Sequence, residues 1–266
     1  MDGTLQDQEL RQIRSFNRNC QSDDAKVWKR FVVWYFIPSL LLLIAIWAFS
    51  FDLKVARWSS DEGCPKLLHE IVMRTEPFGH GAGIVIMLWA IYSLFPQNRK
   101  CISRLLWCAL LPGIVANLIK LVVFRYRPVA FDLMEQSVWA TFGPWTAYYS
   151  TGSACQSFPS AHTATAIGFA IGLAHFFPKG KWLFATLGVM VGFARVIGFA
   201  HYVSDVFIGA MVGWFCAQII LRSTWLDFLF TDWERSPQLS RFFKIQASRI
   251  RCALGYLNSL ASHKSN

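Results

Sequence analysis

Charged residues are scarce in this sequence. They make up 16% of its 266 residues, and only 16 side chains are acidic, whereas 54% of the chain is hydrophobic. Such a composition is too apolar for an ordinary soluble domain of this length. The seven cysteines are too few and too scattered for a disulfide scaffold, and no CxxC or Cys/His spacing resembles a zinc site. Internal repeats and low-complexity linkers are also lacking, so we expect a membrane protein with a single folded domain.

Long apolar runs are present instead. Six of them come close to the roughly 20 residues that a helix needs to cross a bilayer. They are Phe31–Phe51, Gly81–Phe95, Leu105–Phe124, Ala161–Phe177, Trp182–Phe199 and Val206–Leu221. In lipid a backbone amide can bond only within its own segment, so each run is expected to be a helix. The predicted fold class is therefore all-α, a six-span transmembrane helix bundle over residues 31–221.

The basic residues predict the orientation of this bundle. Of the 26 Lys and Arg, 18 lie in the segments 1–30, 97–104, 178–181 and 222–266, which fall on one side of a six-span layout. The positive-inside rule then places both termini in the cytoplasm, in a plasma or inner membrane. The net charge of +10 indicates orientation and contact with an anionic leaflet, and no nucleic-acid partner is expected. Because some 30 polar residues precede the first run, that run is expected to be a retained anchor and no cleavable signal peptide.

Two segments outside the runs predict interfacial amphipathic helices. In 65–77, which prolines bound, the apolar residues share one helical face. These residues are Leu67, Leu68, Ile71 and Val72. In the cytoplasmic tail, 222–266, apolar residues from Phe243 to Ala261 step by four and three, with basic residues off that stripe. The tail therefore predicts a basic amphipathic helix that lies on the inner membrane surface or packs on the cytoplasmic end of the bundle.

Cys64 and Cys155 are the two cysteines in the predicted external loops. Both would face an oxidising compartment, where a disulfide between them could form. Two unpaired cysteines are the alternative.

Ionisable and polar residues concentrate at the predicted outer ends of the spans. They are Lys120, Arg125, Arg127, Ser160, His162, Arg195, His201 and Asp205. Ionisable groups at membrane depth are costly and usually functional. Because four helices deliver these groups to one face, the sequence predicts an active site on the outer side.

The first of three short segments is KLVVFRYRP. Lys120 and Arg127 are two helical turns apart, so on a continuous helix they would share a face about 10 Å apart along the axis. Pro128 disfavours helix at Arg127 and is expected to end the span. Alternatively, Lys120 simply extends its ammonium to lipid phosphates.

In the second segment, SFPSAHTA, Pro159 fits the first turn of a helix. The free amides of Ser160, Ala161 and His162 would then form an anion site at the positive end of the helix dipole. His162 would lie beside this site, although a histidine at a span end can also be merely interfacial.

In the third segment, ARVIGFAHYVSD, His201 and Asp205 are four residues apart. At the start of a helix this spacing brings carboxylate and imidazole together, which fixes the tautomer and makes the other nitrogen a better nucleophile. Gly198 would let the chain leave the preceding helix between Arg195 and His201. A purely structural His/Asp pair is the alternative.

Together, the three segments resemble the signature motifs of the type 2 phosphatidic acid phosphatase superfamily, K-x6-R-P, P-S-G-H and S-R-x5-H-x3-D. Order and internal spacing both match between Lys120 and Asp205. Two positions differ, because Ala161 stands where the family has Gly and Ala194 where it has Ser. A helical φ at residue 161 would accept alanine, whereas a positive φ would make its Cβ costly.

The resemblance implies an integral membrane lipid phosphatase. In that family's scheme His201 attacks phosphorus to form a phosphohistidine, Asp205 orients His201, and His162 acts as general acid. The substrate-binding residues that the resemblance implies are Lys120, Arg127, Ser160, Ala161 and Arg195. No metal or other cofactor is expected, since these cations take the place of magnesium and one carboxylate is too few for a magnesium site.

The implied partners are a phosphorylated lipid and the surrounding membrane lipids. Phosphatidic acid, phosphatidylglycerol phosphate, a polyprenyl diphosphate and a lipid A phosphate are all candidate substrates. A lipid phosphotransferase, an inactive lipid-binding relative and a phosphatase of soluble sugar phosphates remain as alternatives. The sequence leaves the oligomeric state open, a homo-oligomer included.

Overall fold

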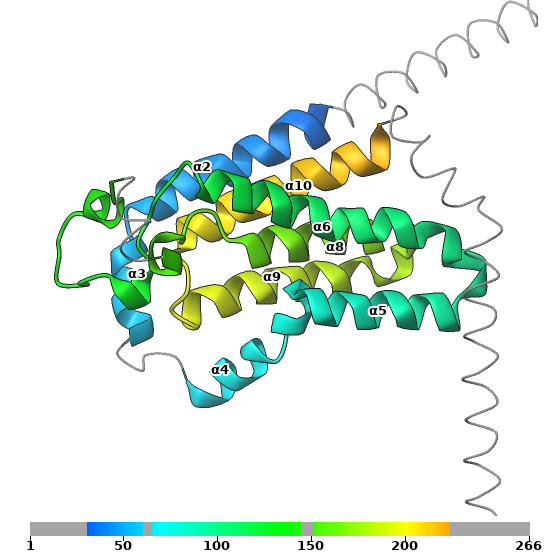
Figure 1. Ribbon diagram of the computed structural model, residues 1–266, viewed down its shortest axis with the longest axis horizontal. Coiled ribbons are helices and arrows are strands. Elements are labelled where there is room, and N and C mark those ends of the chain that lie inside the picture. Colours follow the sequence, from blue (N-terminus) through cyan, green and yellow to red (C-terminus); the bar gives the residue numbers. More distant parts are fainter. Residues whose placement is uncertain (1–30, 61–64, 145–151, 224–266) are drawn as a thin grey trace, which may run out of the picture.

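Helices account for nearly all regular structure in this computed structural model, which describes residues 31–60, 65–144 and 152–223 (Figure 1). The α-helices are α2 (Ile37–Phe49), α3 (Asp52–Ser60), α4 (Lys66–Met73), α5 (Gly81–Leu94), α6 (Ile102–Lys120), α8 (Ala161–Phe176), α9 (Lys181–Ile197) and α10 (Val203–Arg222). Shorter helices are η1 (Val32–Phe36), η2 (Glu76–Gly79), η3 (Pro96–Cys101), η4 (Pro128–Ala130), η5 (Val138–Thr141), η6 (Gly152–Cys155) and η7 (Pro178–Gly180). The all-α prediction is confirmed. The predicted tail helix and Cys64 lie outside the described residues, so the tail and the disulfide stay predictions.

Four helical stretches are long and apolar enough to cross a membrane: Val32–Phe49, Pro96–Lys120, Pro178–Ile197 and Val203–Arg222. A fifth candidate arises if Lys66–Gly79 and Gly81–Leu94, which meet at 69°, are two halves of one broken span. The six predicted spans are therefore supported only in part. Two of the predicted runs form helices of 14 and 16 residues, α5 and α8, which are short for independent spans.

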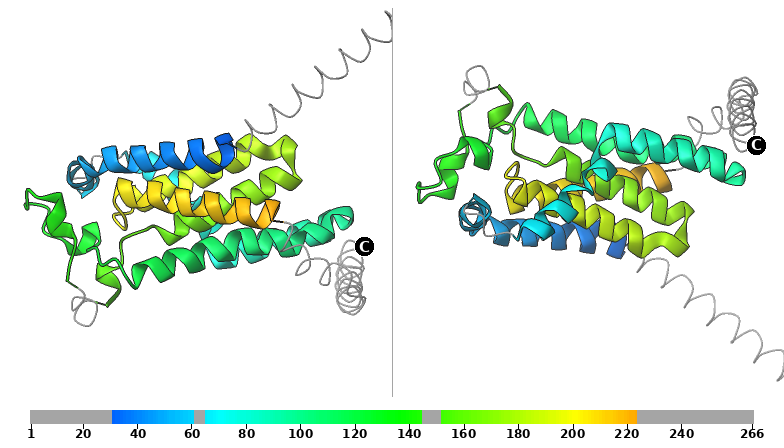
Figure 2. Two further views of the ribbon diagram at one scale, coloured as in Figure 1. Left: turned by 90° about the horizontal axis from the view of Figure 1, so that it is seen from above. Right: turned by 90° about the horizontal axis from the view of Figure 1, so that it is seen from below.

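Helix α8 lies at the centre of the bundle, where it packs against α6, α9 and α10 (Figures 1 and 2). Two glycines allow this close packing. A Cβ on Gly168 would come within 2.3 Å of the Cys108 carbonyl oxygen on α6, and one on Gly213 within 2.4 Å of the Ala164 carbonyl oxygen. Helices α6 and α10 therefore contact the backbone of α8 directly, which fixes the three helices on which the motifs lie.

A helix, α4, does form where the first external loop was predicted to hold an amphipathic helix, although Val72 does not share the exposed face of Leu67, Leu68 and Ile71. Leu67, Leu68 and Ile71 are exposed, while Val72 is buried in a cluster with Ala194 and other residues of α9. The helix thus has one face on the bundle and an apolar face outward, as an interfacial helix requires.

The chain does not continue as a helix from Lys120 to Arg127. Helix α6 ends at Lys120, and the following residues form an extended segment that pairs with a later loop. Arg125 N donates to the Cys155 carbonyl at 3.0 Å, and Arg127 N donates to the Ala154 carbonyl at 2.8 Å. The prediction that Lys120 and Arg127 share one helical face is therefore wrong, because the backbone of this segment finds partners in the loop before α8.

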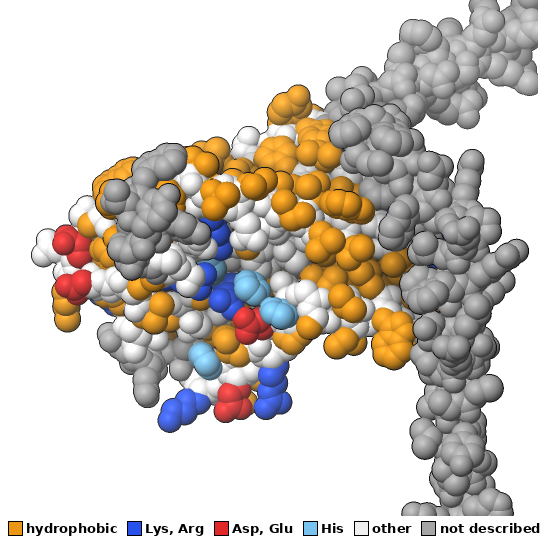
Figure 3. Space-filling model, viewed as in Figure 1, with side chains coloured by type: hydrophobic (Ala, Val, Ile, Leu, Met, Phe, Trp, Pro, Cys, Tyr) orange, Lys and Arg blue, Asp and Glu red, His pale blue; other side chains and the backbone are white. Residues whose placement is uncertain are grey.

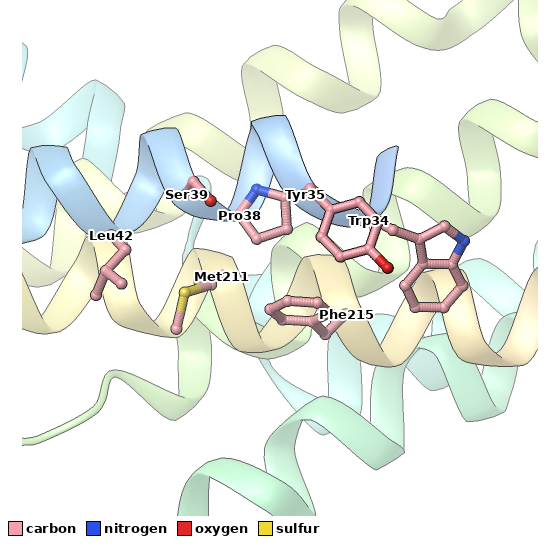
Figure 4. A pocket seen from close by; sticks show the side chains of 7 residues that line it. All are labelled: Trp34, Tyr35, Pro38, Ser39, Leu42, Met211 and Phe215. Carbon is pink, nitrogen blue, oxygen red and sulfur yellow. The ribbon is translucent and has the colours of Figure 1, made fainter. Parts of the chain in front are cut away.

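Helix α2 packs along α10 and leaves an apolar cavity of about 530 Å³ between them (Figure 4). Its lining residues are Trp34, Tyr35, Pro38, Ser39, Leu42, Met211 and Phe215. The cavity lies along the middle of α10, away from Asp205 in the first turn, and its lining residues carry no charged side chain.

Candidate active site

Basic, acidic and histidine side chains gather on one face of the bundle, next to a large hydrophobic surface (Figure 3). The charges of Lys120, Arg127 and Arg195 all act on the imidazole of His201. Those of Lys120 and Arg195 also act on His162. The structure thus brings Lys120, Arg127, Arg195 and both histidines together, although they come from three separate segments of the chain.

His201 lies in the turn between α9 and α10 and is 2% exposed. Its Nδ1 lies 2.6 Å from the carbonyl oxygen of Ser157. Because a carbonyl oxygen can only accept a hydrogen bond, Nδ1 carries the proton of the neutral ring. The Nε2 atom then keeps its lone pair, which is the state that a nucleophile needs.

Asp205, in the first turn of α10, is fully buried. Its Oδ2 accepts from the Ser157 hydroxyl at 2.6 Å and from Tyr202 N at 3.0 Å. The same oxygen is 3.9 Å from His201 Nδ1, which is too far for a hydrogen bond. The four-residue spacing of His201 and Asp205 therefore brings carboxylate and imidazole near each other, as predicted. The direct hydrogen bond of Nδ1, however, is accepted by the Ser157 carbonyl. Asp205 in turn accepts a hydrogen bond from the Ser157 hydroxyl.

The surroundings of His201 lower its pKa well below the usual 6.5. Burial is the largest cause, because it disfavours the charged imidazolium, and Lys120, Arg127 and Arg195 add to it. His201 is therefore neutral near pH 7.

The turn before α10 lies where Gly198 was predicted to let the chain leave the helix. Helix α9 ends at Ile197, and Gly198 has an ordinary φ of −76°. The left-handed residue is Phe199, with a φ of 58°. The amides of Ala200 and His201 both donate to the Arg195 carbonyl, at 3.2 Å and 3.1 Å. The chain does leave the helix where predicted, but the reversal that presents His201 occurs one residue later.

Helix α8 begins at Ala161, and Ser160 is its N-cap, with the Ser160 hydroxyl accepting from Thr163 N at 3.4 Å. Pro159 thus precedes the cap and is not in the first turn. Ser160 N donates to the Asp205 carbonyl at 3.1 Å, so this amide is not free. The first-turn amides of Ala161 and His162 remain, since such amides have no partner within the helix. Because Ala161 is helical and its φ is not positive, alanine fits here without backbone strain.

Arg127 and Arg195 each offer an unused donor. Among the described residues, Arg127 Nε and Arg195 Nε are buried and have no hydrogen-bond partner. Arg195 Nη1 donates to Glu76 Oε1 on η2. A buried guanidinium N–H without a partner is costly, and an anion would satisfy it. The donor set, guanidinium, ammonium and helix amides, is the chemistry of a phosphate site.

Arg125 lies behind the site and is completely buried. Its guanidinium donates to Asp205 at 2.5 Å, to Asp52 at 2.8 Å and to the Ser204 hydroxyl at 2.8 Å. Burial favours the neutral form of Arg125, but the two carboxylates outweigh burial and raise its pKa. The guanidinium also lies over the ring of Tyr202, 4.1 Å from its centre. Arg125 therefore joins α3 to α10 and holds Asp205 from the side opposite Ser157.

We had predicted no role for Ser157, Asp52 or Glu76. Ser157 lies in the segment SFPSAHTA, and this position was a weak indication of a role in the site. Asp52 and Glu76 lie outside all three segments. His80, the N-cap of α5, stacks on His162 with ring centres 6.0 Å apart. In the parts of the chain that the structure describes, no group of three or more His, Cys, Asp or Glu could hold a metal ion.

Residues 102–228, which include all three segments, match the PAP2 superfamily. Residues 102–228 of the chain therefore belong to this superfamily. The predicted family is thereby confirmed, and the PAP2 region covers α6, α8, α9 and α10, the helices around the histidines.

Two curated PAP2 relatives are similar to part of the chain. The lipid A 1-phosphatase of Rhizobium johnstonii is 34% identical over 114 residues, 42% of this chain and 44% of the relative. The lipid A 1-phosphatase of Rhizobium etli is 36% identical over 104 residues, 39% of this chain and 42% of the relative. The similarity thus spans less than half the length of these relatives.

Two solved structures are also similar. Aquifex aeolicus LpxE has a TM-score of 0.48 at 20% identity, covering 65% of this chain and 95% of that one. The first transmembrane PAP2 type phosphatidylglycerolphosphate phosphatase from Bacillus subtilis has a TM-score of 0.46 at 18% identity, covering 69% of this chain and 94% of that one.

Proposed function

We propose that this protein is an integral membrane lipid phosphatase that hydrolyses a phosphomonoester or diphosphate through a phosphohistidine on His201. One observation carries the proposal: a buried neutral histidine lies among three cations, and two of these have buried guanidinium donors without a partner among the residues that the structure describes. The membership in the PAP2 superfamily supports it.

In the proposed reaction Nε2 of His201 attacks phosphorus, and the bond from phosphorus to the leaving oxygen breaks. The ring becomes positively charged as the N–P bond forms. The Ser157 carbonyl, 2.6 Å from Nδ1, and the Asp205 carboxylate, 3.9 Å away, stabilise that charge. His162 gives a proton to the leaving oxygen, and then removes one from the water that cleaves the phosphohistidine.

The phosphoryl oxygens would be held by Lys120, Arg127, Arg195 and the first-turn amides of Ala161 and His162. Phosphoryl transfer depends mainly on such positioning and charge stabilisation. Ser160 would act mostly as the cap that fixes this helix end, because its hydroxyl is 2.9 Å from the Thr163 hydroxyl.

A lipid phosphate is the proposed substrate because the charged face adjoins an extensive apolar surface (Figure 3). Both curated relatives are named lipid A 1-phosphatases, which makes a lipid A phosphate the first substrate to test. We also propose that α5 and α8 complete a six-span bundle, with α4 at the outer interface, both termini cytoplasmic and the site on the outer face.

The test measures inorganic phosphate release by the purified full-length protein from lipid A, phosphatidylglycerol phosphate, phosphatidic acid and a polyprenyl diphosphate. We expect turnover of at least one lipid, unaffected by a chelator, and its loss in a His201→Ala protein that remains folded. Labelled phosphate should be trapped on His201 and not in the variant. Turnover that a chelator abolishes and magnesium restores, or an active His201→Ala protein, would refute the mechanism.

The same assay separates the alternatives. Release of phosphate with no acceptor lipid present identifies a hydrolase, whereas label trapped on His201 but released only to an added lipid identifies a phosphotransferase. If neither turnover nor trapped label is detected, the result identifies a lipid-binding relative.

A further inference from the structure

Arg195 has a partner that lies outside the three motifs. Glu76 Oε1 accepts the hydrogen bond from Arg195 Nη1, and neither side chain makes another side-chain hydrogen bond within the described residues. Glu76 belongs to η2, the short helix that joins α4 to α5. The pair therefore connects the proposed phosphate site to the bent segment beside it.

The two partners of this ion pair differ in their exposure to solvent. The Arg195 side chain is 12% exposed and that of Glu76 is 32% exposed, so the carboxylate belongs to the more solvent-accessible partner. Arg195 Nε is buried and has no hydrogen-bond partner in the described part of the chain. The charge of Glu76 also acts on His162, so the carboxylate lies within the electrostatic field of the proposed site.

A carboxylate in this position uses a donor that a phosphate would need. A phosphate that binds Arg195 through Nη1 must displace the Glu76 carboxylate or share this donor with it. Because Glu76 belongs to the same chain, its effective concentration at Arg195 is high and does not depend on the ligand.

We propose that Glu76 is a tethered competitor of anionic ligands at Arg195 and thereby sets which anions occupy the site. The inference rests on the proposed role of Arg195 as a phosphate ligand. Competition by Glu76 weakens the binding of every anion that needs Arg195. The abundant phosphodiester headgroups of the membrane contact few groups of the site, so their binding does not outweigh the competition by Glu76. A phosphomonoester that also engages Lys120, Arg127 and His201 still binds.

The decisive variant is Glu76→Gln, which removes the charge and keeps the shape. We expect its inhibition constant for inorganic phosphate to be about three- to ten-fold lower than that of the wild type, as the loss of a partly exposed ion pair allows. The matched control is Glu70→Gln. Glu70 is an exposed residue of α4 that pairs with Arg74 at 3.9 Å, and its removal should leave the constant unchanged. An unchanged or higher constant in Glu76→Gln would overturn the proposal.

Two further measurements locate the effect. In an Arg195→Gln background, adding Glu76→Gln should give no further gain, and a gain that persists would show that Glu76 does not compete at Arg195. In mixed micelles, phosphatidylglycerol should inhibit Glu76→Gln at a lower mole fraction than it inhibits the wild type. Equal inhibition would overturn the selection against headgroups. Because an inhibition constant does not depend on the active fraction, partial misfolding of a variant does not affect these comparisons.

Direct phosphate binding by calorimetry separates this inference from the proposed function. Tighter binding by Glu76→Gln in a protein without lipid turnover would refute only the activity. Lipid turnover with equal phosphate binding in both proteins would refute only the role of Glu76.

Discussion

Ser157 connects the two residues on which the proposed chemistry depends. Its carbonyl oxygen holds Nδ1 of His201, and its hydroxyl donates to Asp205. Two groups of one residue thus fix the tautomer of the histidine and the position of the carboxylate. Since Ser157 N also donates to the Arg125 carbonyl at 2.9 Å, its own position is set by the segment after α6.

The lowered pKa of His201 predicts an unusual pH dependence. His201 attacks only when neutral, and burial together with Lys120, Arg127 and Arg195 lowers its pKa, so its acid limb in kcat/KM should lie well below pH 6.5. Lys120→Met removes one of these charges and should move the limb upward, on the order of half to one pH unit.

This prediction is checked by pH–rate profiles of both proteins with one substrate, so that the ionisation of the substrate phosphate cancels. A limb that stays in place or moves to lower pH in Lys120→Met would contradict the effect of the lysine charge on His201.

At this scale, sequence spacing predicted the gathering of charged groups well. His162, His201 and Asp205 were predicted as site residues because each lies at or next to the end of a predicted span, and their catalytic roles stay predictions. The carbonyl of Ser157 could not be predicted, since every residue has a carbonyl and only the folded chain shows which one is used. Glu76 was missed because its partner Arg195 is 119 positions away in the chain.

At the scale of elements, Arg125 joins segments that helix packing alone would leave apart. Asp52 on α3 and Asp205 on α10 both bind its guanidinium, and all three side chains are inaccessible to solvent. The triad is fully hydrogen-bonded, which is the condition under which buried charges are tolerated.

Removal of Arg125 should therefore be costly. Arg125→Met leaves two carboxylates buried without a compensating charge, and we expect a loss of about 3–5 kcal/mol in the free energy of unfolding. Arg74→Met, which removes an exposed arginine from α4, should change stability by less than about 0.5 kcal/mol.

Thermal or denaturant unfolding in detergent measures both variants. A loss below about 1 kcal/mol in Arg125→Met would show that the triad contributes little to the fold.

Helix positions were predictable from the apolar runs, but helix ends were less so. The run that continues to Phe124 is still apolar, yet α6 ends at Lys120 because the following backbone pairs with the loop before α8. Apolar periodicity shows which segments are buried or face lipid. It does not show where the main chain exchanges helical hydrogen bonds for others.

At the scale of the whole molecule, the proposed orientation can be tested by chemical labelling. Met134, which is 87% exposed, lies in the long loop at the end of the bundle that carries the site. Lys100 is exposed on η3, the connection between α5 and α6 at the opposite end (Figure 1).

In intact cells, a membrane-impermeant maleimide should label Met134→Cys and not Lys100→Cys, with the wild type as background for the native cysteines. Labelling of Lys100→Cys alone would reverse the topology and place the site on the cytoplasmic side.

Composition predicted a membrane bundle of helices, whereas the number of spans could not be read from it, because a central helix enclosed by others need not have the full length of a span.

The shortness of α8 has a consequence for the bilayer. Its 16 residues extend about 24 Å, against about 30 Å for a typical hydrocarbon core. If α8 crosses the membrane as proposed, its His162 end lies several ångströms below the level of the lipid headgroups or the surrounding leaflet thins to meet it. Hydrophobic mismatch then becomes part of substrate recognition, because a thicker bilayer would place the scissile phosphate farther from His201.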